Sequence, residues 1–256
     1  MIPSRDLIFH LAAAVGVRNV LKDPLAAINT NVRGTEAVLD HAFRYWKRIV
    51  IASTSEIYGK ASHVPFREDD DRVLGSTAVT RWSYSMSKAI DEHFAFAYAA
   101  KGLPVSIVRY FNSYGPRIDE RGYVSVVANF ARQALRGDPI TVHGDGKQSR
   151  CFTYISDSVV GTLLAGEVEG AIGEAFNIGN PTETPVLELA QTMKRLARSK
   201  SPIQFVPYEA YYGAGFEDTR RRVPAIDKAK RLLGFQPKVG LDSGLKKTLA
   251  WCREHY

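Results

Sequence analysis

The chain has 256 residues, 45% of them hydrophobic and 24% charged, a balance typical of a folded, water-soluble protein with a sizeable core. Lysine and arginine (34) exceed aspartate and glutamate (27), but these basic residues are scattered rather than interleaved with aromatic residues, which argues against nucleic-acid binding. The apolar runs are too short to span a membrane, and Cys151 and Cys252 are too few for a disulfide framework or a zinc site. We therefore expect a cytoplasmic protein without a metal.

Short apolar runs alternate with helical patterns along the first part of the chain. Continuous rather than alternating apolar residues predict strands that are buried on both faces, at residues 7–11, 49–52, 105–108 and 175–178. Apolar residues spaced by three and four predict helices within residues 32–46, 86–97, 124–135 and 186–197. Strand and helix in alternation indicate an α/β protein with a doubly wound parallel sheet.

Glycine and proline become frequent after Phe111 and predict a smaller, loop-rich lobe. Because residues 175–178 return to the pattern of a buried strand, we expect the two units to interleave in sequence. The predicted division is a Rossmann-like cofactor and catalytic domain of residues 1–113 and 150–180, and an α/β substrate-binding lobe of residues 114–149 and 181–256.

Tyr84 and Lys88 lie one turn apart at the start of a predicted helix. A neighbouring ammonium favours the phenolate form of tyrosine, so Lys88 is expected to make Tyr84 an effective general base. The alternative is that both are ordinary residues of a helix surface, because the spacing alone is a weak signal.

The segment from Ser53 to Gly59 directly follows a predicted buried strand. Ligands of α/β sheets bind beyond the carboxyl ends of strands, which is where these polar residues are expected. If the extended conformation continues, Thr54 and Glu56 point one way, and Ser53 and Ser55 the other. The alternative is a helix cap in which Ser53 and Glu56 form a capping box.

Further short motifs follow one another in a set order: His10-Leu11-Ala12-Ala13, Asn31 to Thr35, Arg109 to Asn112, Gln148-Ser149-Arg150, Asn177-Ile178-Gly179 and Arg222-Val223-Pro224. Together with the two features above, this order resembles the extended short-chain dehydrogenase/reductase superfamily, in particular its nucleotide-sugar epimerases, dehydratases and decarboxylases. The resemblance implies NAD as cofactor, a UDP-sugar as substrate and a homodimer formed through the helix after Arg33 and the helix that bears Tyr84.

The same resemblance implies roles for individual residues. Tyr84 would remove the proton of the sugar 4-hydroxyl, Lys88 would hold the nicotinamide ribose, and Thr54 would hydrogen-bond near that hydroxyl. The implied catalytic residues are Tyr84, Lys88, Thr54, Ser55 and Glu56. The implied cofactor-binding residues are Leu11, Ala12, Ala13, Asn31, Ser53, Tyr84, Lys88 and Phe111. The implied substrate-binding residues are Asn112, Thr141, His143, Gln148, Arg150, Tyr212 and Arg222.

The resemblance favours UDP-sugar 4-epimerisation, of a hexose or a hexuronate, through a transient 4-keto intermediate. UDP-glucuronate decarboxylation is the alternative, since Glu56 matches an acidic residue of the decarboxylases and dehydratases. A third reading, from another class, is a cofactor-free and catalytically inactive binding protein of the same fold.

The glycine-rich turn with which the family begins has no counterpart in these residues. The first glycine is Gly16, and no later glycine cluster has the spacing of the NAD pyrophosphate motif after a strand. We therefore expect an incomplete sheet, with about 60 residues lacking before Met1, if roughly 30 residues form each βαβ unit. Weak NAD binding and poor solubility, from apolar surface exposed at residues 7–11, are further expectations.

Overall fold

A four-stranded parallel sheet lies at the centre of the computed structural model, which describes residues 6–118, 125–212 and 217–255, apart from the side chains of Arg18 and Tyr212. Its strands are β1 (Leu7–His10), β2 (Arg48–Thr54), β3 (Val105–Tyr110) and β8 (Ala175–Ile178), in the order β1-β2-β3-β8. All three pairings are parallel. The four predicted strands and the α/β class are confirmed.

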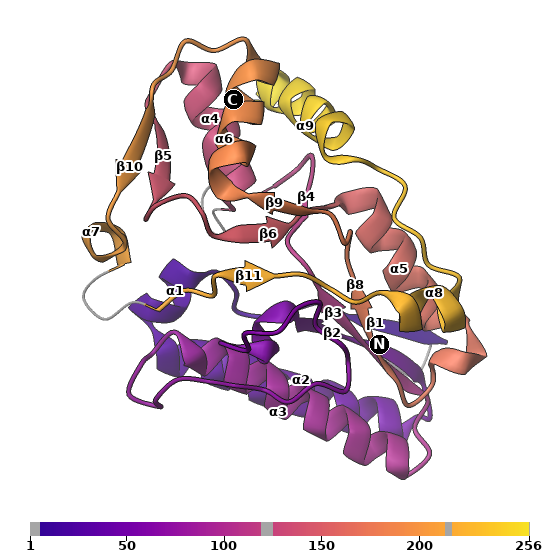
Figure 1. Ribbon diagram of the computed structural model, residues 1–256. Helices are drawn as coiled ribbons and strands as arrows, with labels where there is room; N and C mark the ends of the chain where they lie inside the picture. Colours follow the sequence, from indigo (N-terminus) through magenta and orange to yellow (C-terminus); the bar gives the residue numbers. More distant parts are fainter. Residues whose placement is uncertain (1–5, 119–124, 213–216, 256) are drawn as a thin grey trace.

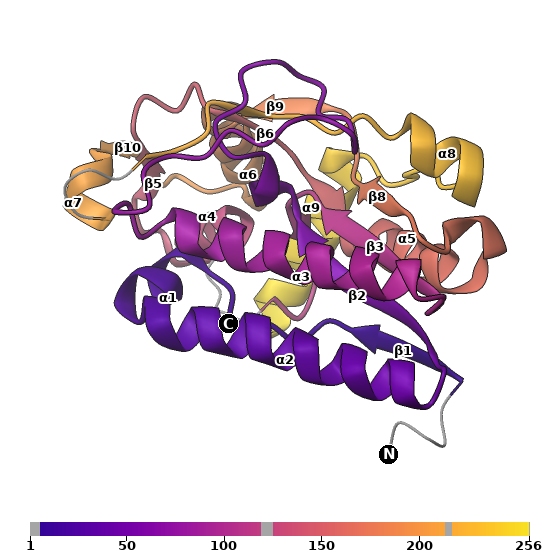
Figure 2. The same ribbon diagram turned by 90° about the horizontal axis from the view of Figure 1, so that it is seen from below.

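Helices cover both faces of this sheet, which is why its strands are apolar throughout. On one face lie α2 (Pro24–Arg44) and α3 (Trp82–Ala100), and on the other α5 (Ile155–Glu167) and α8 (Asp227–Leu233) (Figures 1 and 2). Successive side chains of β2 enter different cores: Ile49 and Ile51 pack beneath α2 and α3, whereas Val50 packs beneath α5 and α8. The short helix α1 (Val17–Lys22) precedes α2, whose first turn is capped by Asp23, which accepts a hydrogen bond from the Ala26 amide.

A third core holds a second group of elements together. It is formed by α4 (Val126–Arg136), α6 (Val186–Ala197) and α9 (Leu241–His255), packed with the parallel strands β5 (Ile140–His143) and β10 (Ile203–Val206). The remaining elements are short: β4 (Ser113–Tyr114), β6 (Ser149–Cys151), β7 (Thr153–Tyr154), β9 (Glu183–Pro185), β11 (Arg221–Arg222), η2 (Ser55–Tyr58), η3 (Glu169–Ala171) and α7 (Tyr208–Tyr212).

The predicted helices correspond to α2, α3, α4 and α6, although α2 begins earlier than the apolar pattern indicated, because Asp23 and Pro24 start it. We propose the same two-unit division as above. One element crosses it, since Ala229 and Leu233 of α8 pack with the central sheet rather than with the third core.

Strand β1 lies at an edge of the sheet and pairs with β2 alone among the described strands. Apolar side chains are exposed beside this edge: Leu11 is 56% exposed, and α5 exposes Val159 (48%) and Leu163 (42%). The apolar surface predicted near residues 7–11 is therefore present, and its effect on solubility stays a prediction. In the described part of the chain, no helix combines the length and hydropathy that crossing a bilayer requires.

Candidate active site

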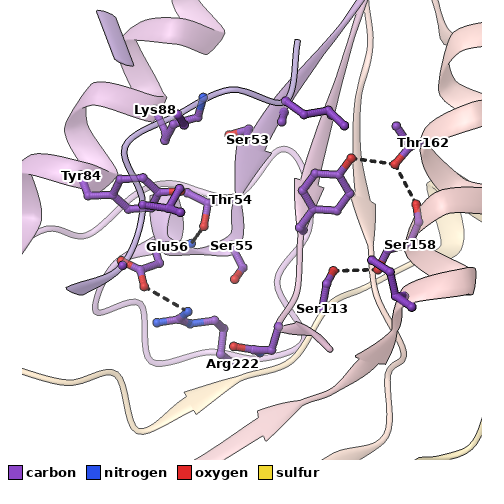
Figure 3. Close-up of a pocket in the computed structure, with 18 of the residues that line it drawn as sticks. Ser53, Thr54, Ser55, Glu56, Tyr84, Lys88, Ser113, Ser158, Thr162 and Arg222 are labelled. Atoms are coloured by element: carbon purple, nitrogen blue, oxygen red, sulfur yellow. Dashed lines mark hydrogen bonds and ion pairs between the residues drawn. The ribbon is translucent and has the colours of Figure 1, made fainter. Parts of the chain in front are cut away.

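A cavity of about 570 Å³ opens at the carboxyl ends of β1, β2 and β3, between α3 and α5. This is where parallel α/β sheets bind their ligands. Figure 3 shows Tyr84, Thr54 and Glu56 on one side, Arg222 below them, and Ser113, Ser158 and Thr162 on the opposite side. The cavity brings together many of the predicted site residues: Leu11, Ala13, Ser53, Thr54, Ser55, Glu56, Tyr84, Lys88, Asn112 and Arg222.

The end of β2 changes conformation at Ser55, so the helix cap is the alternative that the structure has, and the extended conformation ends at Thr54. Thr54 is the last strand residue, and its hydroxyl accepts a hydrogen bond from the Glu56 amide (3.2 Å), which caps the 3₁₀ helix η2. The predicted helix cap is therefore confirmed with Thr54 as the capping residue, whereas Ser53 hydrogen-bonds to Glu92 and not to Glu56. The turn lets all four residues from Ser53 to Glu56 line the cavity.

Ser53 is tied to a buried network behind the cavity. Its hydroxyl donates a short hydrogen bond to Glu92 of α3. Glu92 also receives two hydrogen bonds from the guanidinium of Arg109 on β3, at 3.0 and 2.7 Å, and Arg109 donates to the Tyr58 hydroxyl at 2.8 Å. Because these groups come from β2, η2, β3 and α3, the network fixes the cavity floor.

The start of α3 carries the tyrosine and lysine of the predicted pair. Tyr84 and Lys88 both line the cavity, and Tyr84 extends toward the end of β2 (Figure 3). Ser85 donates to the Glu56 carbonyl oxygen (2.8 Å), which joins α3 to η2. Lys88 is buried and pairs with Asp91 at 2.7 Å.

Three arginines and two carboxylates form a charged group beside the cavity. Glu56 lies 3.6 Å from both Arg81 and Arg222. Asp218 lies 3.2 Å from Arg81 and 2.8 Å from Arg150, and it accepts a hydrogen bond from the Tyr208 hydroxyl. The excess of one positive charge suits an anionic ligand.

Burial acts strongly on this charged group. It lowers the pKa of Arg222 to about 10, although Glu56 opposes the change. Burial by itself would raise the pKa of Asp218, but Arg150, Arg81 and Arg222 outweigh it, so that this pKa is lowered. Arg222 therefore remains protonated at neutral pH but is a stronger acid than an exposed guanidinium.

A chain of hydroxyl groups forms the opposite wall. Tyr110 hydrogen-bonds to Thr162 at 2.6 Å, and Ser113 hydrogen-bonds to Ser158 at 2.7 Å (Figure 3). Thr162 also donates to the Ser158 carbonyl oxygen. This wall therefore offers polar groups within the largely apolar face of α5.

Four predicted substrate-binding residues lie outside this cavity. Thr141 hydrogen-bonds to Gln133 inside the lobe (2.8 Å), and Gln148 donates to the carbonyl oxygen of His143 (2.8 Å). The centroid of the His143 ring lies 4.4 Å from that of the Tyr211 ring. Arg150 is connected to the cavity indirectly, because it pairs with Asp218, which in turn pairs with the cavity residue Arg81. The side chain of Tyr212 lies outside the described residues.

Three predicted cofactor-binding residues do not line the cavity either: Ala12, Asn31 and Phe111. Phe111 is fully buried against Tyr58 and Phe66. Asn31 accepts a hydrogen bond from the Ala14 amide (2.7 Å) and donates to the Ala14 carbonyl oxygen and to Ser87. Its amide therefore fixes the loop after β1 instead of facing the cavity.

Sequence reasoning missed Arg81, Asp218 and Asp91 as parts of the site. Arg81 could have been found from its place one turn before Tyr84, and Asp91 from its place one turn after Lys88, because residues three apart share a helix face. Asp218 meets Arg81 only through the tertiary fold, so no spacing within one element pairs the two. Among the described residues, no group of three or more metal-ligating side chains gathers.

Comparison with known proteins gives consistent matches over nearly the whole chain. The family model described as GDP-mannose 4,6 dehydratase matches residues 4–248. The UDP-N-acetyl-alpha-D-glucosaminuronate decarboxylase of Bacillus cytotoxicus is 45% identical over 254 residues, which cover 99% of this chain and 78% of that protein. UDP-glucuronic acid decarboxylase 1 of Danio rerio is 40% identical over 96% of this chain, but over only 57% of its own length.

A solved structure matches the fold as well. The UDP-glucuronic acid 4-epimerase of Bacillus cereus, in complex with UDP-glucuronic acid and NAD, superposes with a TM-score of 0.86 at 28% identity. The match covers 98% of this chain and 76% of that one.

Proposed function

Because the chain belongs to the GDP-mannose 4,6 dehydratase family, within the extended short-chain dehydrogenases/reductases that act on nucleotide sugars, we propose that it decarboxylates a UDP-hexuronate through a 4-keto intermediate. The observation that carries the proposal is the meeting of Glu56 and Arg222 beside Tyr84 in one cavity. A carboxylate and an arginine at this point serve chemistry at the sugar carboxyl, beyond the oxidation at C4.

The described residues suit the nicotinamide end of NAD. The cavity has the volume of a typical small-molecule site, and its wall combines apolar residues with Ser53, Tyr84 and Lys88. Leu11, Ala13, Ser53, Tyr84 and Lys88 would hold the nicotinamide and its ribose. When bound, NAD would supply the acceptor for the hydride of C4.

Tyr84 and Thr54 are placed to act on the 4-hydroxyl of the sugar. In the proposed step, the Tyr84 phenolate takes the hydroxyl proton as the C4 oxygen becomes a carbonyl. Thr54 donates its hydroxyl proton as a hydrogen bond to the same oxygen, while its own oxygen still accepts from the Glu56 amide. Lys88 supplies the positive charge that favours the phenolate.

Decarboxylation then breaks the bond between C5 and C6 of the 4-keto acid. Carbon dioxide leaves, and the electron pair enters an enolate whose oxygen is the former carbonyl oxygen at C4. Tyr84, now protonated, and Thr54 stabilise this oxygen. A proton must be added at C5, and we assign its delivery to Arg222, which lies 3.6 Å from Glu56 and would regain its proton from solvent. Glu56 would hold Arg222 in place for this transfer. The hydride taken from C4 would then return there from the reduced cofactor while Tyr84 gives its proton back to the C4 oxygen, so that the product differs from the substrate by carbon dioxide alone.

UDP-sugar 4-epimerisation, which the motifs alone favoured, is the second candidate. It uses the same Tyr84 and Lys88 but keeps the carboxyl group and returns hydride to the other face of C4. The match to the Bacillus cereus 4-epimerase supports it. We place decarboxylation first because of the Glu56–Arg222 pair and the 45% identity to a decarboxylase.

The deciding experiment incubates the purified protein with NAD and either UDP-glucuronate or UDP-N-acetylglucosaminuronate, and follows the products by mass spectrometry. Loss of the mass of carbon dioxide is expected. A product of unchanged mass, with its 4-hydroxyl inverted by NMR, would establish the epimerase instead. If neither substrate reacts and NAD does not bind, the cofactor-free binding protein is the remaining function.

The compartment belongs to the same proposal. Cys151 and Cys252 are both buried, and no disulfide forms in the part of the chain that the structure describes. Buried thiols are compatible with a reducing cytoplasm.

A further inference from the structure

Lys88 carries its ammonium in an unusually buried place. The residue is 2% exposed, although it lines the cavity. An ammonium removed from water is destabilising unless a counter-ion and hydrogen bonds replace its hydration. Asp91, one turn further along α3, accepts a hydrogen bond from Lys88 Nζ at 2.7 Å and is itself 0% exposed. The two charges are therefore buried together.

Asp91 is the one carboxylate paired with Lys88 among the described residues. The neighbouring Glu92 is turned away, because its oxygens receive hydrogen bonds from Arg109 and Ser53. The positive charge of Lys88 therefore depends on Asp91 as its counter-ion. Neither the sequence motifs nor the proposed reaction gives Asp91 a role.

The other described groups packed around Asp91 supply no second positive charge that could replace Lys88 as its partner. From β1, His10 hydrogen-bonds to Thr35 of α2 (3.2 Å), and burial together with Lys88 lowers the pKa of His10, so that it is neutral at neutral pH. Burial raises the pKa of Asp91 and Glu92 adds to this effect, whereas Lys88 and the Thr35 hydroxyl lower it. Among the described residues that face Asp91, Lys88 is thus the one cation.

The contact with Asp91 leaves N–H donors of the Lys88 ammonium available to the cavity. A lysine ammonium has three N–H donors, and the hydrogen bond to Asp91 uses one of them. Asp91 does not line the cavity, so it touches neither substrate nor cofactor. It can hold Lys88 from behind while the other donors face a ligand.

We propose that Asp91 is a positioning residue that anchors the Lys88 ammonium at the cavity wall and keeps it protonated. The anchoring is inferred from the Lys88–Asp91 contact alone. The effect of Asp91 on turnover, in contrast, rests on the proposed function. A charged Lys88 is what favours the Tyr84 phenolate, so loss of Asp91 weakens the base indirectly.

The test replaces the carboxylate by its isosteric amide, Asp91→Asn, in the full chain without cofactor. The signal of the Lys88 ammonium is followed by NMR of ¹⁵N-lysine-labelled protein against pH, and is assigned by its loss in Lys88→Arg. In Asp91→Asn the ammonium is expected to lose its proton about 1–3 pH units lower than in the unaltered protein. The matched control is Asp40→Asn, which removes the exposed pair with Arg44 and should leave the Lys88 signal unchanged.

An unchanged Lys88 titration in folded Asp91→Asn overturns the proposal. If that variant does not fold, Lys88→Met gives the reciprocal test: the ¹³C carboxyl signal of Asp91 must titrate at higher pH than in the unaltered protein, and an unchanged titration also overturns it. In turnover assays of Asp91→Asn, the alkaline fall of carbon dioxide release should move to lower pH. A protein that releases no carbon dioxide contradicts the proposed function alone, because the NMR titration still decides the role of Asp91.

Discussion

Tyr84 is the residue on which the proposed chemistry depends most directly. Replacement by phenylalanine keeps the ring but removes the group that takes the proton of the sugar hydroxyl. Tyr84→Phe is expected to lower kcat about 100-fold to 10,000-fold, the usual contribution of general base catalysis. Turnover is measured by product mass spectrometry, and UDP-sugar affinity by calorimetry should change little. A variant with kcat near that of the unaltered protein would assign the base to another residue.

In the proposed reaction, Glu56 serves the decarboxylation but not the oxidation at C4. Glu56→Gln removes the charge that lies 3.6 Å from both Arg81 and Arg222. We expect carbon dioxide release to fall about 100-fold or more, while the 4-keto acid still forms. The matched control is Glu188→Gln, on the exposed side of α6. Equal loss of both steps would show that Glu56 is needed for binding instead.

His10 connects stability to pH. Burial, together with Lys88, holds its pKa below the ordinary value of 6.5, so the unfolded chain binds a proton more readily than the folded one. The stability contributed by neutral His10 is complete above about pH 6.5 and is lost as the pH falls below it. The free energy of unfolding in urea should therefore fall as the pH is lowered from about 6.5 through the folded-state pKa of His10. His10→Gln should reduce that fall, and the exposed His93→Gln should not.

At the scale of elements, the loop after β1 is held by a helix rather than by its own sequence. Asn31 of α2 makes hydrogen bonds to both backbone groups of Ala14 and a third to Ser87 of α3. These bonds connect β1, α2 and α3 at the edge of the cavity. The loop after β1, which carries the predicted cofactor-binding residues Leu11 to Ala13, thus depends for its shape on Asn31, although Asn31 does not line the cavity.

Asn31→Ala should loosen this junction. Its loss leaves the Ala14 amide and carbonyl without their partners, at a cost of about 1–3 kcal/mol in the free energy of unfolding. Hydrogen exchange at the Ala14 amide should accelerate, while exchange in β3 should change only with global stability. Asn29→Ala, on the same helix and partly exposed, is the control. Unchanged exchange at Ala14 would contradict the role of Asn31.

The sequence predicted elements better than their ends. The strands were recognisable because each is covered on both faces, and α3 because its apolar residues recur at helical spacing. The turn at Ser55 was not, since extended and capped conformations place the same polar residues after the strand. Thr54 decides between them with one hydrogen bond to the Glu56 amide.

On the scale of the whole molecule, α2 and α3 expose apolar side chains that the fold leaves uncovered. Leu25 is 68% exposed, Met86 40%, and Ile28 and Ile90 are each 37% exposed. The two helices lie side by side on one face of the sheet (Figure 2). We propose that this face joins two copies of the chain, in keeping with the homodimer that the family resemblance implies.

Charge on this face should separate the copies. Ile28→Glu combined with Ile90→Glu is expected to convert a dimer to a monomer in analytical ultracentrifugation, because each interface would bury unpaired carboxylates. Ile172→Glu is the matched control, since Ile172 is also 37% exposed but lies beyond α5. A protein that is monomeric before any substitution would contradict the proposal.

The sequence by itself determined the α/β class, the four strands of the sheet, and the Tyr84–Lys88 pair, because strand burial and helical spacing are local patterns. It also indicated that Ser53 to Glu56 lie at the end of a strand. Only the tertiary structure decided that Glu56 meets Arg222, that Arg81 and Arg150 share Asp218, and that Asn31 supports the loop beside the cavity. Because those contacts join residues far apart in the chain, a local sequence pattern cannot predict which charged side chains are buried together.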